Sequence, residues 1–169
     1  MVIVKQHSVK KINILILAIQ IIGINFIILS GRIFSNLTDI KFSEIMNSLK
    51  PNDNIIEFAN KNQIEGLQIS DFIQTMIAFE FIGLFIGLII CYFIIKKREI
   101  SMLNFVFLFL ISLILLYKKL VFTLFNFGNI GNYFESFETL IIFTGSAFLI
   151  TALISFLLSA KLKTNKMSE

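Results

Sequence analysis

Two charged side chains stand at apolar stretches of this sequence. Glu80 lies within "MIAFEFIGLFIGLIICYFIIKKRE", and Lys119 comes near the end of the stretch that begins "SMLNFVFLFLISLILLYK". A charge in hydrocarbon is costly, so such groups usually face the interior of a bundle and pair with one another. Counted at 1.5 Å per residue from Ile95 and Ser101, Glu80 lies about 22 Å and Lys119 about 27 Å along its helix. We therefore predict that Glu80 and Lys119 form an intramembrane polar pair.

Three interpretations of this pair are open. A buried pair can fix one arrangement of helices without any further role. An intramembrane carboxylate can also belong to a proton or ion path. The third interpretation is a polar pocket for a quinone or a lipid headgroup.

Small residues follow Glu80 along the same helix. Gly83, Gly87 and Cys91 come three, seven and eleven residues later, and this spacing places all four residues on one face. Gly83 and Gly87 form a GxxxG motif, which lets helices approach closely in a membrane. We predict that these two glycines pack against another helix and that Cys91 is a small packing residue.

A comparable stripe precedes Lys119, with Ser101, Asn104, Leu108, Ser112 and Leu115 at helical spacing. The polar interior that both stripes predict is completed by residues of the first and last apolar segments: Gln20, Asn25, Thr144, Ser155 and Ser159.

The elements that position these residues are membrane helices. The 169 residues are 56% hydrophobic and include twenty Phe and one Pro, and the mean hydropathy is +0.85, which soluble domains do not reach. Four apolar segments, at about 12–30, 72–95, 101–125 and 139–160, each supply the roughly 20 residues that cross a bilayer. The predicted fold is an all-α integral membrane four-helix bundle, a single domain over 1–169.

The first segment follows a basic end, as a signal peptide does, but "ILSGR" lacks a small-x-small cleavage site. We expect it to be a retained helix.

Basic residues indicate the orientation. Cytoplasmic flanks are enriched in Lys and Arg. Nine of the fifteen basic residues flank the same ends of the predicted helices, namely Lys5, Lys10, Lys11, Lys96, Lys97, Arg98, Lys161, Lys163 and Lys166. We predict a multi-pass protein of the cytoplasmic (inner) membrane with both termini cytoplasmic and residues 31–71 outside. This clustering beside apolar runs also excludes nucleic acid as a partner, despite the net charge of +4.

The outward loop 31–71 is long for a helical hairpin, and loops of this kind usually carry function or structure. Short helices are predicted over "DIKFSEIMNSL" and "NIIEFA". They can form an amphipathic cap on the bundle or the outer membrane surface. Alternatively they form a docking surface for a partner.

The order of these features resembles the DoxX and MauE group of small four-helix membrane proteins. The resemblance rests on "SGRIF" at the end of the first span, "DIKFSEIMNSLKP" in the outward segment, and "FEFIGLFIGL" with an acidic residue before a Gly-Leu-rich stretch. It covers about half of the chain. It implies an accessory role near quinone-linked or periplasmic redox systems.

No catalytic site is predicted. The single cysteine excludes an intrachain disulfide and a CxxC motif, and no His cluster, activated nucleophile or phosphate-binding glycine loop is present in the sequence. We expect no metal and no cofactor. The predicted function is a non-catalytic subunit or accessory factor of a membrane complex, whose partners are the lipid bilayer and other subunits. The alternatives are a small transporter or ion-conducting homo-oligomer that uses Glu80, and a DoxX-like redox accessory protein.

Overall fold

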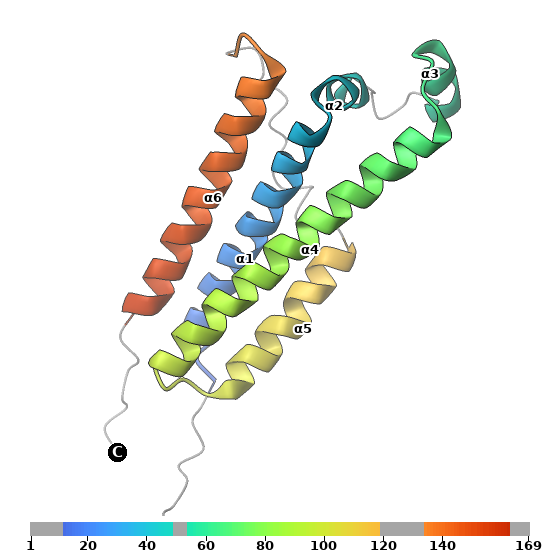
Figure 1. Ribbon diagram of the computed structural model, residues 1–169. Helices are drawn as coiled ribbons and strands as arrows, with labels where there is room; N and C mark the ends of the chain where they lie inside the picture. Colours follow the sequence, from blue (N-terminus) through green and yellow to red (C-terminus); the bar gives the residue numbers. More distant parts are fainter. Residues whose placement is uncertain (1–11, 49–53, 119–133, 163–169) are drawn as a thin grey trace, which may run out of the picture.

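The computed structural model describes residues 12–48, 54–118 and 134–162, and every regular element in these ranges is a helix. In chain order the helices are α1 (Ile14–Ser35), η1 (Asn36–Thr38), α2 (Ile40–Asn47), α3 (Ile55–Lys61), α4 (Gly66–Lys97), α5 (Met102–Lys118) and α6 (Phe137–Lys161). Figure 1 shows α1 between α6 on one side and α4 with α5 on the other. The predicted all-helical class is confirmed for these residues.

Three helices are long and apolar enough to cross a membrane: α1 continued through η1, α4, and α6. Each has at least 25 residues and therefore spans about 37 Å or more at 1.5 Å per residue, compared with a hydrocarbon core of about 30 Å. This supports a multi-pass membrane protein. The predicted third span, 101–125, is represented by the shorter apolar helix α5, and residues 119–125 lie outside the described residues.

The helix ends differ from the predicted spans at the side where α1 ends and α4 begins. α1 continues to Ser35, and α4 begins at Gly66 rather than near residue 72. Hydropathy marks only the part of a helix that lies in hydrocarbon, whereas backbone hydrogen bonding continues into water. α4 begins with a capping box, in which the Glu65 N–H donates to Gln68 Oε1 at 3.1 Å. Residues 31–35 and 66–71, which the sequence analysis assigned to the outward loop, are therefore helical parts of α1 and α4.

Close backbone approach holds α4 against α1. A Cβ atom placed on Gly83 would lie 2.8 Å from the carbonyl oxygen of Ile27, and one placed on Gly31 would lie 2.6 Å from the carbonyl oxygen of Phe79. Gly87 faces Ile24 in the same interface. The absence of Cβ atoms at these positions lets the two backbones touch, which increases van der Waals contact where no hydrophobic effect drives association.

The other side of α1 packs against α6 in a similar way. A Cβ on Gly23 would meet the ring of Phe156, and a Cβ on Gly145 would meet the ring of Phe34. The Ser30 hydroxyl donates to the carbonyl oxygen of Gly145 at 2.8 Å. α1 is thus the central helix, and it contacts α4, α5 and α6.

Polar contacts join the helices at the basal end, which we define as the end where α1 begins and α4 ends. The Asn13 N–H donates to Asn104 Oδ1 at 3.0 Å, and Asn104 Nδ2 donates to the Asn13 carbonyl at 3.0 Å. The Arg98 guanidinium donates to the carbonyl oxygens of Ala160 and Leu162 at the end of α6. These bonds satisfy backbone groups at helix ends and connect α1 with α5 and α4 with α6.

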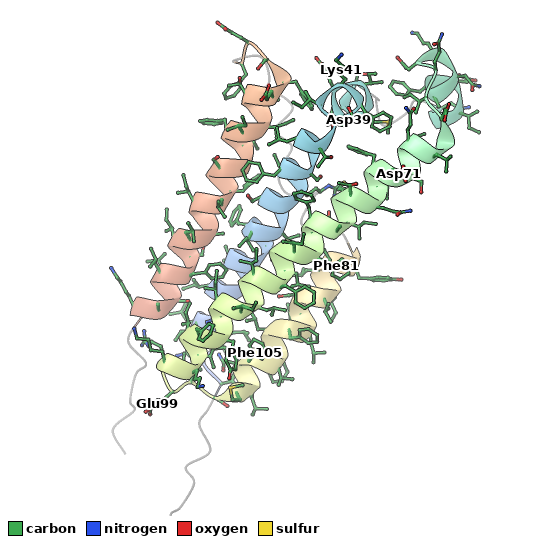
Figure 2. The ribbon with its side chains drawn as sticks, in the orientation of Figure 1. Asp39, Lys41, Asp71, Phe81, Glu99 and Phe105 are labelled. Carbon is green, nitrogen blue, oxygen red and sulfur yellow. The ribbon has the colours of Figure 1, made fainter. Side chains whose placement is uncertain are left out.

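The opposite, apical end carries the small helices. α2 lies across the end of α1, and its buried Phe42 packs edge to face on Phe72 of α4, with ring centroids 5.3 Å apart. α3 stands away from the other helices at the tip of α4 (Figure 1). Figure 2 shows Asp39, Lys41 and Asp71 at the apical end and Glu99 at the basal end.

Candidate functional site: a charged pair between α1 and α4

A charged pair joins α1 and α4, whose backbones meet closely at Gly31 and Gly83. Arg32 Nη1 of α1 lies 3.3 Å from Glu80 Oε1 of α4. The Glu80 side chain is 11% exposed and the Arg32 side chain 23% exposed. Glu80 lies in the buried stripe that also contains Gly83, Gly87 and Cys91. The glutamate therefore points into the helix interface and meets a cation there.

The end of α1 is built to hold Arg32. Arg32 lies in the last turn of α1, where the partial negative charge of the helix end favours a cation. The carbonyl oxygen of Arg32 accepts hydrogen bonds from Ser35 Oγ at 2.7 Å and from Asn36 Nδ2 at 3.2 Å. These bonds stabilise the last turn, so the arginine extends from an ordered backbone toward α4.

The pair lies far from the basal end. Arg32 is eighteen residues after Ile14, which corresponds to a rise of about 27 Å along α1. For a hydrocarbon core of about 30 Å beginning near Ile14, the pair is located close to the apical boundary of the core. The α2 helix and the Phe42–Phe72 contact lie on its apical side. An ion pair at such a boundary is partly shielded from water without being in the centre of the bilayer.

The predicted partner of Glu80 was Lys119, which lies outside the described residues. In the predicted stripe that leads to Lys119, Asn104, Leu108 and Ser112 are buried. Ser101 and Leu115 of the same stripe are half-buried. A second cation near Glu80 therefore stays a prediction. Sequence reasoning missed Arg32 as a partner because hydropathy placed it in a turn after the first span. The distance along the helix could have identified Arg32. Counted from the basal ends, Arg32 on α1 and Glu80 on α4 lie at comparable distances.

The other polar residues predicted for the interior differ in whether their side chains have hydrogen-bond partners. Gln20, Thr144, Ser155 and Ser159 are buried, and Asn25 is half-buried. Ser155 and Ser159 donate to carbonyl oxygens of their own helix, whereas both side-chain polar atoms of Gln20 have no hydrogen-bond partner among the described residues.

Ser112 of α5 lies at about the same distance from the basal end as Gln20 of α1. Gln20 lies seven residues beyond Asn13 on α1, and Ser112 lies eight residues beyond Asn104 on α5. Because Asn13 and Asn104 are bonded and the two helices run in the same direction, Gln20 and Ser112 lie at about the same height. The Ser112 hydroxyl also has no partner among the described residues. Gln20 and Ser112 are thus two buried polar side chains at a similar height, and neither has a hydrogen-bond partner within the described ranges.

The chemistry available in the described residues is limited to these polar groups. No group of three His, Cys, Asp or Glu side chains that could hold a metal ion occurs there. Cys91 is completely buried and free. The arrangement can hold helices together, or accept and release a proton at Glu80.

The chain matches no protein-family model, and no curated protein or solved structure is significantly similar to it.

Proposed function

We propose that this protein is a non-catalytic subunit or accessory factor of a membrane complex, which contacts its partner through an arm at the apical end. The apical arm consists of α3 and residues 62–71. The observation that carries the proposal is that this arm extends beyond the bundle while exposing large apolar side chains.

The length of α4 produces the arm. Its 32 residues rise about 48 Å, which exceeds the hydrocarbon core by more than a quarter of its length. Ile56 in α3 is 71% exposed and Leu67 in the first turn of α4 is 74% exposed. No other described helix packs extensively on α3. Apolar side chains beyond the hydrocarbon gain from burial against a partner, about 1.5–3 kcal/mol for each complete side chain.

Site-specific photocrosslinking in intact cells tests this proposal. We expect a photoreactive residue at Ile56 or Leu67 to form an adduct with one partner protein, and Ile56→Ser combined with Leu67→Ser to weaken that association by about tenfold or more. Ile150 of α6, which is 56% exposed within a span, is the matched control and should crosslink to lipid. Lipid adducts alone at Ile56 and Leu67 would instead identify the arm as a surface-lying cap and refute the proposal.

Our proposed orientation has the apical end outside and both termini in the cytoplasm of a bacterial-type inner membrane. It is supported by the basic residues of the basal end, including Lys96, Lys97 and Lys161 in the last turns of α4 and α6. In a Cys91→Ala background, Asn60→Cys should react with an impermeant thiol reagent on intact cells, because Asn60 is exposed in α3. Lys97→Cys should react only after permeabilisation. The reverse pattern would invert the orientation.

An ion- or proton-conducting oligomer that uses Glu80 is the second candidate. The unsatisfied Gln20 and Ser112 favour it, since buried polar groups in membranes often mark ion pathways. The arrangement along α1 weighs against a continuous path. Asn25 is separated from Gln20 by five residues, or about 140° around the helix, so Arg32 and Asn25 share one side whereas Gln20 and Asn13 share another. A homo-oligomer in mild detergent, with proton flux lost in Glu80→Gln, would favour this candidate.

The resemblance to DoxX and MauE proteins supports a third, related proposal, a redox accessory role. The resemblance depends on the same three stretches, and Glu80 is the acidic residue that precedes the Gly-Leu-rich stretch. Co-purification of a quinone-linked or periplasmic redox enzyme would support this role over the other two.

A further inference from the structure

An apolar groove runs along the α4–α5 surface near the basal end. It has a volume of about 530 Å³ and is lined by Phe85, Leu88, Ile89, Tyr92, Phe93, Phe105 and Phe109. This volume falls within the range of ligand pockets, about 300–1,000 Å³. The lining residues belong to one face of α4 and one face of α5, and they lie within the apolar part of both helices.

Aromatic rings give the groove a defined shape. Tyr92 of α4 contacts Phe105 of α5 edge to face, with ring centroids 5.7 Å apart, and it contacts Phe93 in the same way at 5.7 Å. Phe105 is labelled in Figure 2 beside the basal part of α4. Rings have few rotamers, so the groove loses little conformational entropy when an apolar chain occupies it.

A cation lies at one end of this groove. Lys96 Nζ is 5.9 Å from the centre of the Tyr92 ring, and Lys96 is exposed in the last turn of α4. Lys96 is four residues after Tyr92, so it extends from the groove face, whereas Lys97 is about 100° away around the helix. Glu99 is in the turn between α4 and α5, three residues after Lys96. The groove therefore combines an apolar channel inside the span with an exposed ammonium at the membrane boundary.

We propose that this groove binds one anionic phospholipid, with an acyl chain along the aromatic wall and the phosphate at Lys96. The groove has an apolar wall within the span and a cation at the membrane boundary, and this arrangement complements an acyl chain joined to an anionic headgroup. Basic sites at the ends of membrane helices are known to bind anionic headgroups. A lipid held in this way would be retained more strongly than the lipids that surround the rest of the protein. The inference is independent of the apical arm, which lies at the other end of α4.

Native mass spectrometry of the full-length chain, titrated with phosphatidylglycerol or phosphatidylcholine, tests the proposal. We expect a 1:1 adduct that forms at lower concentration with phosphatidylglycerol. Lys96→Gln should weaken phosphatidylglycerol binding about fivefold, the effect of one lysine at an anionic interface, and should leave phosphatidylcholine binding unchanged. Lys97→Gln is the matched control, because it removes an equal charge outside the groove.

A second pair of variants tests the apolar wall. Ile89→Trp should fill the groove and weaken binding of both lipids, whereas Ile150→Trp on α6 should change neither. If Lys96→Gln and Lys97→Gln have equal effects, or if the two lipids bind equally well, the groove has no specific lipid site and the proposal is overturned. A two-chain complex that forms without lipid and is lost in Ile89→Trp would identify a second copy as the occupant, and it would also overturn the proposal.

Discussion

Arg32→Met should lower the free energy of unfolding in mild detergent by about 2–4 kcal/mol. Removing one partner of a buried pair typically costs about 3–5 kcal/mol because the other charge stays buried without compensation. The expected value here is smaller because both side chains keep some exposure at the apical boundary. Thermal or denaturant unfolding followed by circular dichroism measures the effect. Lys41→Met, which removes an exposed cation from α2, is the matched control and should change little.

Glu80→Gln combined with Arg32→Met should recover most of the loss, since neutral replacements of a buried pair are often tolerated. A structural pair predicts recovery of both stability and association with partners. A conducting role predicts a stable double variant without proton or ion flux, because no titratable carboxylate is left in that span. If Arg32→Met proves as stable as the unmodified protein, the pair contributes nothing to folding.

The same comparison of single and double variants, with Lys119 in place of Arg32, tests the predicted pairing of Glu80 with Lys119. If Lys119 is a second partner, Lys119→Met should also destabilise the protein, and Glu80→Gln with Lys119→Met should recover part of that loss. If Arg32 alone compensates Glu80, Lys119→Met should have little effect. The two cycles thus assign the partner of Glu80 without relying on the pair distance.

Gly83→Ala should destabilise the protein by about 1–3 kcal/mol, the usual cost of overpacking. The new methyl group would lie 2.8 Å from the Ile27 carbonyl oxygen and 3.0 Å from the Ile28 Cα, so α1 would have to move away. At Gly87 the nearest atoms are side-chain carbons of Ile24 and Ile27, which can shift, so Gly87→Ala should cost less. Unfolding measurements on both variants give the order.

Gly66→Ala is the control for this series. A Cβ at Gly66 meets nothing within 4 Å, and the substitution restricts the unfolded chain, so the expected change is neutral or slightly stabilising. Alanine favours a helix more than glycine does, so a loss in Gly83→Ala has to come from packing. Equal losses for Gly83→Ala and Gly66→Ala would mean that the α1–α4 contact does not determine the effect.

The predictions for Arg32→Met and Gly83→Ala concern the same interface. Gly31, Arg32, Glu80 and Gly83 all lie where α1 and α4 meet, so the close approach of the backbones brings the arginine within reach of the glutamate. Because residues in contact are not additive, Gly83→Ala combined with Arg32→Met should cost less than the sum of the two single changes. Separation of the helices by the first substitution already weakens the pair.

The sequence by itself determined the all-helical class, the apolar helices and the two stripes of buried residues. These features follow from local chemistry: long apolar runs must form helices in a bilayer, and residues three or four positions apart share a face. The stripe from Glu80 to Cys91 and the stripe from Asn104 to Ser112 are accordingly buried. Helix ends were less predictable. Hydropathy indicates whether a residue lies in hydrocarbon or in water, but it does not indicate whether the backbone is helical, as it is at Gly31, Arg32 and Gly66.

Only the tertiary structure decided which helices meet. Arg32 and Glu80 are 48 residues apart in the chain, and their contact depends on the rotation of α1 and α4 about their axes, which a one-dimensional pattern does not contain. The central position of α1 also depends on long-range contacts, the Asn13–Asn104 bonds with α5 and the Ser30–Gly145 bond with α6. Each of these bonds is local in space but not in sequence. The periodicity of a helix therefore indicates which face is buried, whereas the packing of all the helices together selects the partner that buries it.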